Sequence, residues 1–172
     1  MFDFGITGYR PQWLQGVEAV AATHGRRLAG LAGRTLHHVW LVWDLDVDEW
    51  FVDCPVLLDF GDERVEINHQ KTDDLSITFN SIDPSQPVRW STSDDLPLTW
   101  RPEPLPQLGE LCGQELRQAQ LLGRAGGTMA DDSVALGFRF TAGHLTIYNA
   151  FDENGLLFDP PGQDWREHLL DR

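Results

Sequence analysis

The sequence predicts an α+β fold in which two tandem copies of a four-stranded antiparallel unit form one sheet-rich domain, with an N-terminal helix and a short C-terminal helix. Three patterns support this prediction: an internal repeat, alternation of apolar residues within it, and helical spacing of apolar residues towards both ends. We expect a single domain over residues 1–172, with repeats at 31–83 and 111–161 and a connecting segment at 84–110.

The internal repeat aligns LAGRTLHHVWLV with LCGQELRQAQLL, 80 residues further along the chain. VEI and LTI match at the same displacement, and VLLDF matches VALGF at a displacement of 78. DDLSITF resembles ENGLLF when Gly155 is treated as an additional residue. Because the four matches keep their order, they indicate a duplication.

Each repeat has the period-two pattern of strands with one buried face. We expect strands near 35–43, 50–60, 64–70 and 75–80, and near 115–122, 133–140, 144–149 and 155–159. The first of these is apolar at both parities, which predicts a central strand covered on both faces. The residues expected in the core are Val56, Leu58, Phe60, Val134, Leu136 and Phe138. The pair Asn154–Gly155 predicts a tight turn with positive φ.

Outside the repeats, the sequence predicts two helices. One follows Pro11, with Gly25 as its expected end, and the other is the C-terminal stretch DWREHLLDR, with Asp164 as N-cap. Segment 84–110 is rich in proline and serine and predicts a connection with one edge strand near Val88–Trp90.

The charge balance restricts the partners. The chain has 27 Asp and Glu against 13 Lys and Arg, a net charge of −14. Nucleic acids and anionic membranes are disfavoured because both attract positive charge, whereas a basic protein fits. Two cysteines are too few for a disulfide framework. With no secretory signal and no apolar run of membrane length, we expect a cytoplasmic protein.

The stretch DLDVDEW is the strongest local accumulation of acids. Its aspartates have the opening spacing of a helix–loop–helix calcium site, but Glu49 stands where that loop needs glycine and Pro55 where it needs glutamate. A non-standard divalent-cation site stays an alternative to a hairpin tip whose carboxylates project into water. The expected partner-binding residues are Asp44, Asp46, Asp48, Glu49, Trp50 and Asp53.

A second candidate site is His69 with Asp73 and Asp74, since a histidine and a carboxylate can act as acid and base. The simpler interpretation is a histidine at a strand end followed by a polar turn. If the copies pair about a twofold axis, His69 and Asn149 would line a shared cleft. Common nucleophile, phosphate-binding and zinc motifs are missing, so we expect no cofactor and favour a role without catalysis.

Three stretches, VWLVWDLDVDEWFVDCPVLL, NHQKTDDLSITFNSID and IYNAFDENGLLFDPP, resemble a family of small bacterial proteins of unknown function. The resemblance runs from about residue 31 to residue 161 and implies no activity. In size, acidity and lack of a catalytic motif, the chain is also similar to immunity proteins that neutralise bacterial toxins.

These patterns lead to three functional hypotheses. The first is a macromolecular recognition protein, such as an immunity-type inhibitor of a basic protein. The second is a small-molecule-binding protein or hydrolase with a cleft between the two repeats. The third is a structural subunit of a larger assembly. A stoichiometric partner would favour the first or third, and a tightly retained small ligand the second.

Overall fold

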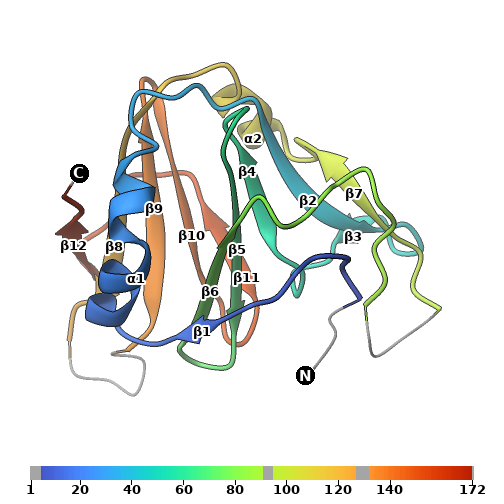
Figure 1. Cartoon of the computed structure of the whole chain (residues 1–172), viewed down its shortest axis with the longest axis horizontal. Coiled ribbons are helices and arrows are strands. Elements are labelled where there is room, and N and C mark those ends of the chain that lie inside the picture. The colour runs from blue at the N-terminus through green and yellow to red at the C-terminus, as the bar shows by residue number, and fades with distance from the viewer. Residues whose placement is uncertain (1–4, 91–94, 127–131, 172) are drawn as a thin grey trace.

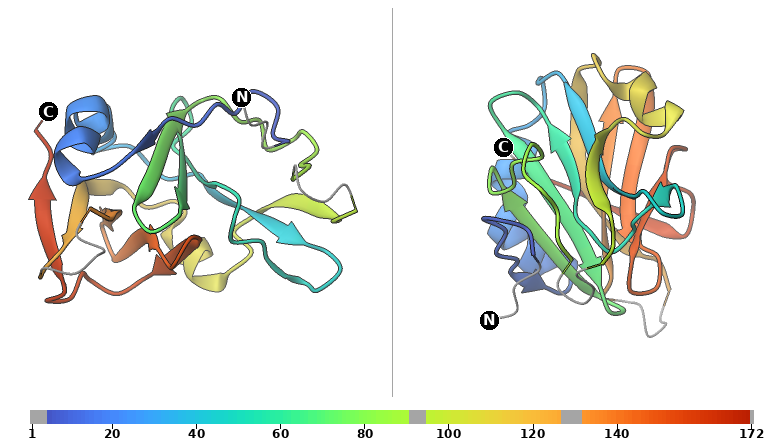
Figure 2. Two further views of the ribbon diagram at one scale, coloured as in Figure 1. Left: turned by 90° about the horizontal axis from the view of Figure 1, so that it is seen from below. Right: turned by 90° about the vertical axis from the view of Figure 1, so that its right-hand side faces the viewer.

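The computed structural model describes residues 5–90, 95–126 and 132–171 of the chain. It contains two antiparallel sheets, which Figure 2 shows as separate layers. Helix α1 (Val17–Ala29) packs against the second sheet, and α2 (Pro106–Leu111) is a short helix between the sheets in chain order (Figure 1). The described chain is therefore mainly β, with few helices.

The first sheet has seven strands. They are β1 (Trp13–Leu14), β2 (His38–Asp44), β3 (Glu49–Trp50), β4 (Val56–Asp59), β5 (Arg64–Gln70), β6 (Asp74–Phe79) and β7 (Leu98–Pro102). Their order is β1-β6-β5-β4-β2, and both β3 and β7 pair with β2. Asp44 pairs with residues of both β3 and β7, so these two strands lie on opposite sides of β2.

The second sheet has five strands. They are β8 (Leu116–Arg124), β9 (Val134–Phe140), β10 (Gly143–Asn149), β11 (Asn154–Leu157) and β12 (Trp165–Leu169). Their order is β11-β10-β9-β8-β12. Thus β2-β4-β5-β6 and β8-β9-β10-β11 are both meanders of adjacent antiparallel strands.

The main core contains residues of both sheets and both helices. The alternating residues predicted to be buried are all in it, each at most 4% exposed: Val56, Leu58, Phe60, Val134, Leu136 and Phe138. The prediction of their burial is therefore confirmed. Hydrophobic burial of this kind is the largest favourable contribution to folding.

A second core covers the other face of the seven-stranded sheet. It includes Tyr9 from the N-terminal segment and Trp100 from β7. Strand β2 contributes to both cores, with Val39 and Leu41 in the main core and Val42 in the second. The expectation of a central strand covered on both faces is confirmed.

The two meanders meet where β2 and β8 begin, and the backbone bonds there are reciprocal. The N–H of Gly33 donates to the carbonyl of Leu116, and that of Gly113 to the carbonyl of Leu36, each at 2.7 Å. Leu36 and Leu116 donate in turn to the carbonyls of residues 114 and 34, at 2.9 and 2.8 Å. We call these two segments, 33–36 and 113–116, the junction. Gly33 and Gly113 have φ of 90° and 86°, a conformation that L side chains rarely adopt.

Both predicted helices need correction. The N-terminal helix starts only after Gly16, because Trp13 and Leu14 pair with β6, and it continues through Gly25 to Ala29. A Cβ at Gly25 would lie 3.3 Å from the Leu170 side chain, so glycine here leaves room for a neighbour and does not end the helix. The C-terminal helix is wrong. Residues 165–169 form β12, which pairs with the edge of β8, and a nine-residue helix would have been marginal alone.

The connecting segment also differs from the prediction. No strand forms at Val88–Trp90, where the N–H of Arg89 donates to the carbonyl of Gly5 at 3.0 Å. The edge strand is β7, and α2 follows it. The sequence pattern missed both because their apolar residues fill spaces next to β2 that are created by distant parts of the chain.

The predicted turn at Asn154–Gly155 is wrong as well, since neither residue has positive φ and both belong to β11. The turn residues with positive φ are Phe151 and Asp152. A Cβ on Gly155 would lie 2.5 Å from the ring of Tyr148, its cross-strand partner. The glycine is therefore needed for close approach of an aromatic ring.

Replacing Gly113 with alanine tests the backbone strain at the junction. A Cβ at this position would meet no atom within 4 Å, so the cost arises from φ of 86° alone. We expect Gly113→Ala to lower the free energy of unfolding by about 1–2 kcal/mol. Gly109→Ala is the matched control, because Gly109 also has open space but lies in α2 with negative φ. If urea titrations show the same change in the free energy of unfolding for both variants, the positive φ of Gly113 is not the cause of the destabilisation.

Removing the Phe138 side chain tests the main core. Phe138 is 1% exposed, so Phe138→Ala should cost about 3–5 kcal/mol, measured by urea or thermal unfolding. Phe151→Ala is the control, since Phe151 is 94% exposed and its removal should change stability by less than about 0.5 kcal/mol. A small effect at Phe138 would show that the sheets do not depend on this contact.

Candidate partner-binding surfaces

The acidic stretch forms the β2–β3 hairpin at the right-hand end of the molecule in Figure 1. Trp43 pairs with Trp50 across it, and residues 45–48 make the turn. The N–H of Leu45 donates to the carbonyl of Pro97 at 3.1 Å, which attaches the tip to the segment before β7. The hairpin is thus stabilised by the segment before β7 as well as by the pairing of β2 with β3.

The carboxylates of this hairpin do not all project into water. Asp46, Asp48 and Glu49 are exposed, whereas Asp44 is buried. One oxygen of Asp44 accepts the backbone N–H of Asp46 at 2.9 Å, an Asx turn that stabilises the hairpin tip. Asp44 therefore departs from the predicted arrangement and has a local structural role.

Asp48 is exposed but has partners. It accepts the indole N–H of Trp43 at 2.8 Å and pairs with Arg101 at 3.4 Å, and both interactions lower the pKa of its carboxyl. The Arg101 guanidinium also lies 5.2 Å from the centre of the Trp43 ring. The stretch has no base in sequence, but β7 supplies one from 53 residues away.

Apolar residues accompany the acids at the tip. Leu45 is 49% exposed and Val47 is 61% exposed. Trp50, in contrast, is half-buried and packs against the main core. The side chains at the tip that are free to enter a partner's pocket are therefore those of Leu45 and Val47.

Asp53 belongs to a second acidic site, which we call the acidic corner: Asp53, Asp152 and Glu153, together with Phe151. Asp53 is half-buried, and its pKa is raised by burial and by the nearby charges of Glu153 and Asp152. Phe151 is 94% exposed and has φ of 63°. The corner lies at the turn between β10 and β11, at the lower edge of Figure 1 and away from the hairpin tip.

Specific bonds fix the conformation of this turn. Asn149 accepts the N–H of Asp152 at 3.0 Å, and Ala150 donates to the carbonyl of Glu153 at 2.8 Å. Asp152 accepts the N–H of Lys71, and Asn149 donates to the carbonyl of Lys71 at 2.8 Å, so the β5–β6 turn abuts the β10–β11 turn. Of the corner residues, only Asp53 was among the predicted site residues, although an aromatic residue within the polar turn NAFDEN is a detectable signal.

His69 lies in the contact between the two sheets. It is 1% exposed, and its ring nitrogens face the carbonyl of Val134 at 2.9 Å and the side-chain oxygen of Asn154 at 3.2 Å. Burial lowers the pKa of His69, and these two hydrogen bonds oppose the shift. A neutral ring has one N–H, and the shorter contact favours its donation to Val134.

Asn154 is the hub of this contact. Its amide nitrogen lies 3.0 Å from the carbonyls of Val52 and Cys54 and 2.8 Å from the side-chain oxygen of Asn68, and these three acceptors share its two N–H groups. Its oxygen accepts the backbone N–H of His69 at 2.9 Å. These bonds determine the orientation of the amide, so the oxygen must face His69.

The residues of the predicted catalytic alternative have separate partners. Asp73 and Asp74 accept the side-chain amide of Gln15, at 3.2 and 2.8 Å, and Asp74 also pairs with Lys71 at 3.2 Å. The His69 ring bonds to Asn154 and Val134 instead. Asn149 lies beside the residues that follow His69, bonded to the carbonyls of Gln70 and Lys71.

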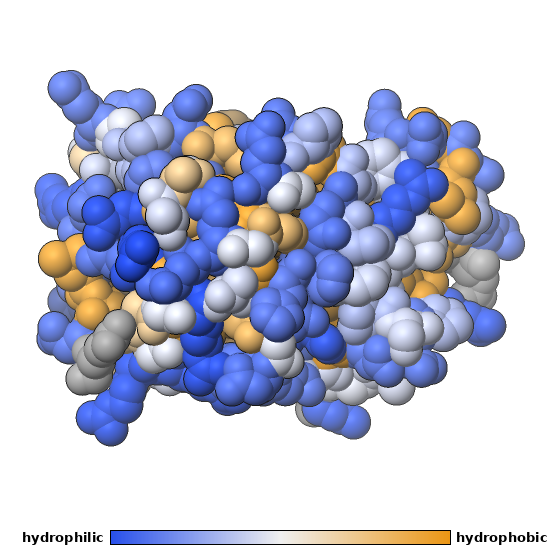
Figure 3. All heavy atoms as spheres, turned by 90° about the horizontal axis from the view of Figure 1, so that it is seen from above, coloured by the Kyte–Doolittle hydropathy of each residue, from blue (hydrophilic) through white to orange (hydrophobic). Residues whose placement is uncertain are grey.

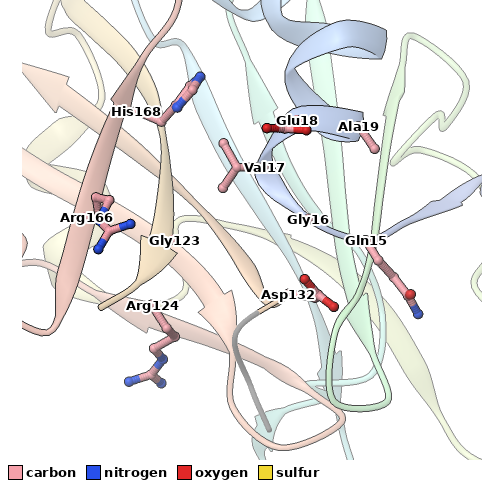
Figure 4. A pocket seen from close by; sticks show the side chains of 10 residues that line it. All are labelled: Gln15, Gly16, Val17, Glu18, Ala19, Gly123, Arg124, Asp132, Arg166 and His168. Carbon is pink, nitrogen blue, oxygen red and sulfur yellow. The ribbon is translucent and has the colours of Figure 1, made fainter. Parts of the chain in front are cut away.

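A pocket of about 540 Å³ lies between the start of α1 and the ends of β8 and β12 (Figure 4). Glu18 lines it from the α1 side, and Arg124, Arg166 and His168 line it from the two strands. Asp132 adds a second acid. The lining has mixed charge. It includes Gly123, which pairs with Val134, the residue whose carbonyl faces the His69 ring.

Three further findings bear on the choice of function. No three His, Cys, Asp or Glu side chains of the described ranges gather as a metal site. Within the same part of the chain, no helix has the length and apolar character to cross a membrane. The face in Figure 3 is mainly hydrophilic, with its hydrophobic atoms in small separate patches.

Comparisons with protein-family models, curated proteins and solved structures gave no significant match to this chain.

The buried state of His69 predicts how stability depends on pH. In the unfolded chain the ring takes up a proton near pH 6.5, whereas the folded protein holds its pKa lower. The unfolded state then binds more protons, so the free energy of unfolding should fall as the pH decreases from about 7.5 to about 5.5. This contribution is present above the unfolded pKa and is lost below it.

The measurement is urea unfolding of the wild type and of His69→Gln across that pH range. His24 also has a lowered pKa, from burial and from Arg27, and it contributes with the same sign in both proteins. The free energy of unfolding is plotted against pH for each protein, and the difference between the two slopes gives the contribution of His69. Identical slopes would refute the assignment.

Proposed function

We propose that the protein recognises a basic protein partner through the β2–β3 hairpin, and that inhibition of a basic toxin, as by an immunity protein, is the most specific form of this role. The observation that carries the proposal is the exposure of Leu45 and Val47 in the same hairpin as the exposed acids Asp46 and Glu49. Apolar contact area surrounded by charge is the usual composition of a protein interface.

Each expected residue has a place in this proposal. Asp46 and Glu49 attract the partner over distance and act mainly on the association rate. Asp44 and Asp48 support them by holding the turn, through the N–H of Asp46 and the indole of Trp43. Trp50 supports the hairpin from the core side, and Asp53 adds negative charge at the acidic corner.

A small-molecule-binding protein or hydrolase is the second candidate. The pocket beside α1 favours it, because Glu18, Arg124, Arg166 and His168 line a volume that suits a small polar ligand. The predicted cleft at His69 has less support, since that ring is buried and its two nitrogens face oxygens of Asn154 and Val134. A ligand that survives purification would favour this candidate, and a stoichiometric protein would favour recognition or a structural subunit.

We also infer that the two meanders are copies of one ancestral unit within a single cytoplasmic domain. Strand pairing supports the duplication: Val39 pairs with Leu58 and Ala119 with Phe138, each residue 80 positions further on. Leu58 and Phe138 then pair with Val65 and Leu145 at the same displacement. With a displacement of 80, Leu58 corresponds to Phe138. The sequence match of VLLDF with VALGF had used a displacement of 78 and aligned Leu58 with Leu136. Two free cysteines fit a reducing compartment.

Neutralising the exposed acids tests the proposed hairpin surface. A partner is first recovered by affinity purification from the native cell and identified by mass spectrometry. Asp46→Asn with Glu49→Gln should then slow association at low salt by about two- to tenfold, with little change in dissociation. Folding should be unchanged because both side chains are exposed. Asp48 is left intact because it bonds to Trp43.

The matched control is Glu110→Gln with Asp171→Asn, which removes two exposed acids elsewhere. It should leave the association rate closer to that of the wild type. If both double variants slow association equally, net charge alone acts and the hairpin has no special part.

A further inference from the structure

Phe151 is the most exposed of the large hydrophobic residues in the described chain, at 94%. Its backbone has φ of 63°, and the next residue has φ of 72°, values that glycine or asparagine adopts more readily. Hydrogen bonds on both sides keep the turn in this conformation. The ring is thus held out into solvent at some cost in stability, and its contacts within the fold do not explain it.

The chain itself shows what an aromatic ring next to a carboxylate can bind. Arg27 lies 4.0 Å from the centre of the Phe79 ring and pairs with Glu63 at 2.6 Å. Arg101 lies over Trp43 and pairs with Asp48 at 3.4 Å. In both places one guanidinium contacts a ring face and a carboxylate together.

The acidic corner has two of these three components. Phe151 supplies the ring, and Asp53, Asp152 and Glu153 supply the carboxylates. Burial and the nearby charges of Glu153 and Asp152 raise the pKa of Asp53. Lys71, on the abutting turn, pairs through its ammonium with Asp74. An arginine from outside would complete the arrangement and reduce the repulsion.

We propose that the acidic corner binds an arginine side chain of a protein partner, with the guanidinium stacked on Phe151 and paired with the flanking carboxylates. This inference rests on the proposed recognition of a basic protein and adds a second contact to it. The Phe151 face and the carboxylates together select arginine over lysine, because a guanidinium is planar, stacks on rings and is more weakly hydrated than an ammonium.

The test is titration of the full chain, followed by NMR, with a synthetic peptide of alternating arginine and glycine and with its lysine counterpart. The arginine peptide should bind about two- to fivefold more tightly and shift the amide signals of residues 150–153 and of Asp53. Phe151→Leu should bind both peptides equally, because it keeps the charges and removes the ring. Phe151→Tyr should keep the preference for arginine.

Two results would overturn the proposal: equal binding of the two peptides to the wild type, or an arginine preference that survives in Phe151→Leu. Amide shifts confined to residues 44–50 would also overturn it, because they would place the peptide on the hairpin. The hairpin variant Asp46→Asn with Glu49→Gln should still bind the arginine peptide at the corner. Peptide titration therefore tests the acidic corner alone. The proposed role of the hairpin is tested separately, by the rate of association with the native partner.

Discussion

The rest of the structure depends on the junction, where four backbone hydrogen bonds join residues 33–36 to residues 113–116. Since β2 follows one segment and β8 the other, these bonds hold together the starts of the first strands of both meanders. Each later strand is then positioned by antiparallel pairing with the one before it. The apolar faces of both sheets are thereby directed at one shared core.

Side-chain hydrogen bonds close the opposite end of the sheets. Asn154 from β11 bonds to His69 on β5 and to the segment before β4, so one amide joins three parts of the chain. The neighbouring turns abut through Lys71 and Asp152. Lys71, in the β5–β6 turn, and Phe151, in the β10–β11 turn, are 80 residues apart and both have positive φ, 51° and 63°. The two turns thus have similar backbones but carry different side chains. One turn carries an ammonium and the other an exposed ring.

Local patterns in the sequence were sufficient to predict most strands and the buried alternation in VLLDF and VALGF. They failed where a distant part of the chain determines the conformation. Residues 165–169 have helical spacing, but the unpaired edge of β8 offers backbone hydrogen bonds to a strand, which a short helix cannot match. Gly155 looked like a turn residue because only the folded sheet brings the Tyr148 ring against it. For the candidate site, the acids of the hairpin could be predicted, whereas Arg101 beside Asp48 and Glu153 beside Asp53 could not, because sequence separation hides both contacts.

The excess of acids alone does not favour recognition over simple solubility, since a net charge of −14 would keep any small domain dispersed. The exposed apolar residues separate the two explanations. Leu45 and Val47 lie among the hairpin acids and Phe151 among those of the corner, each at a position where a polar residue would serve solubility better. The hairpin tip and the corner turn are also held by bonds to other segments, at Pro97 and at Lys71, so little ordering entropy is lost when a partner binds. Charge, apolar exposure and a fixed backbone coincide at both places, and the proposed contact with a basic protein would account for all three.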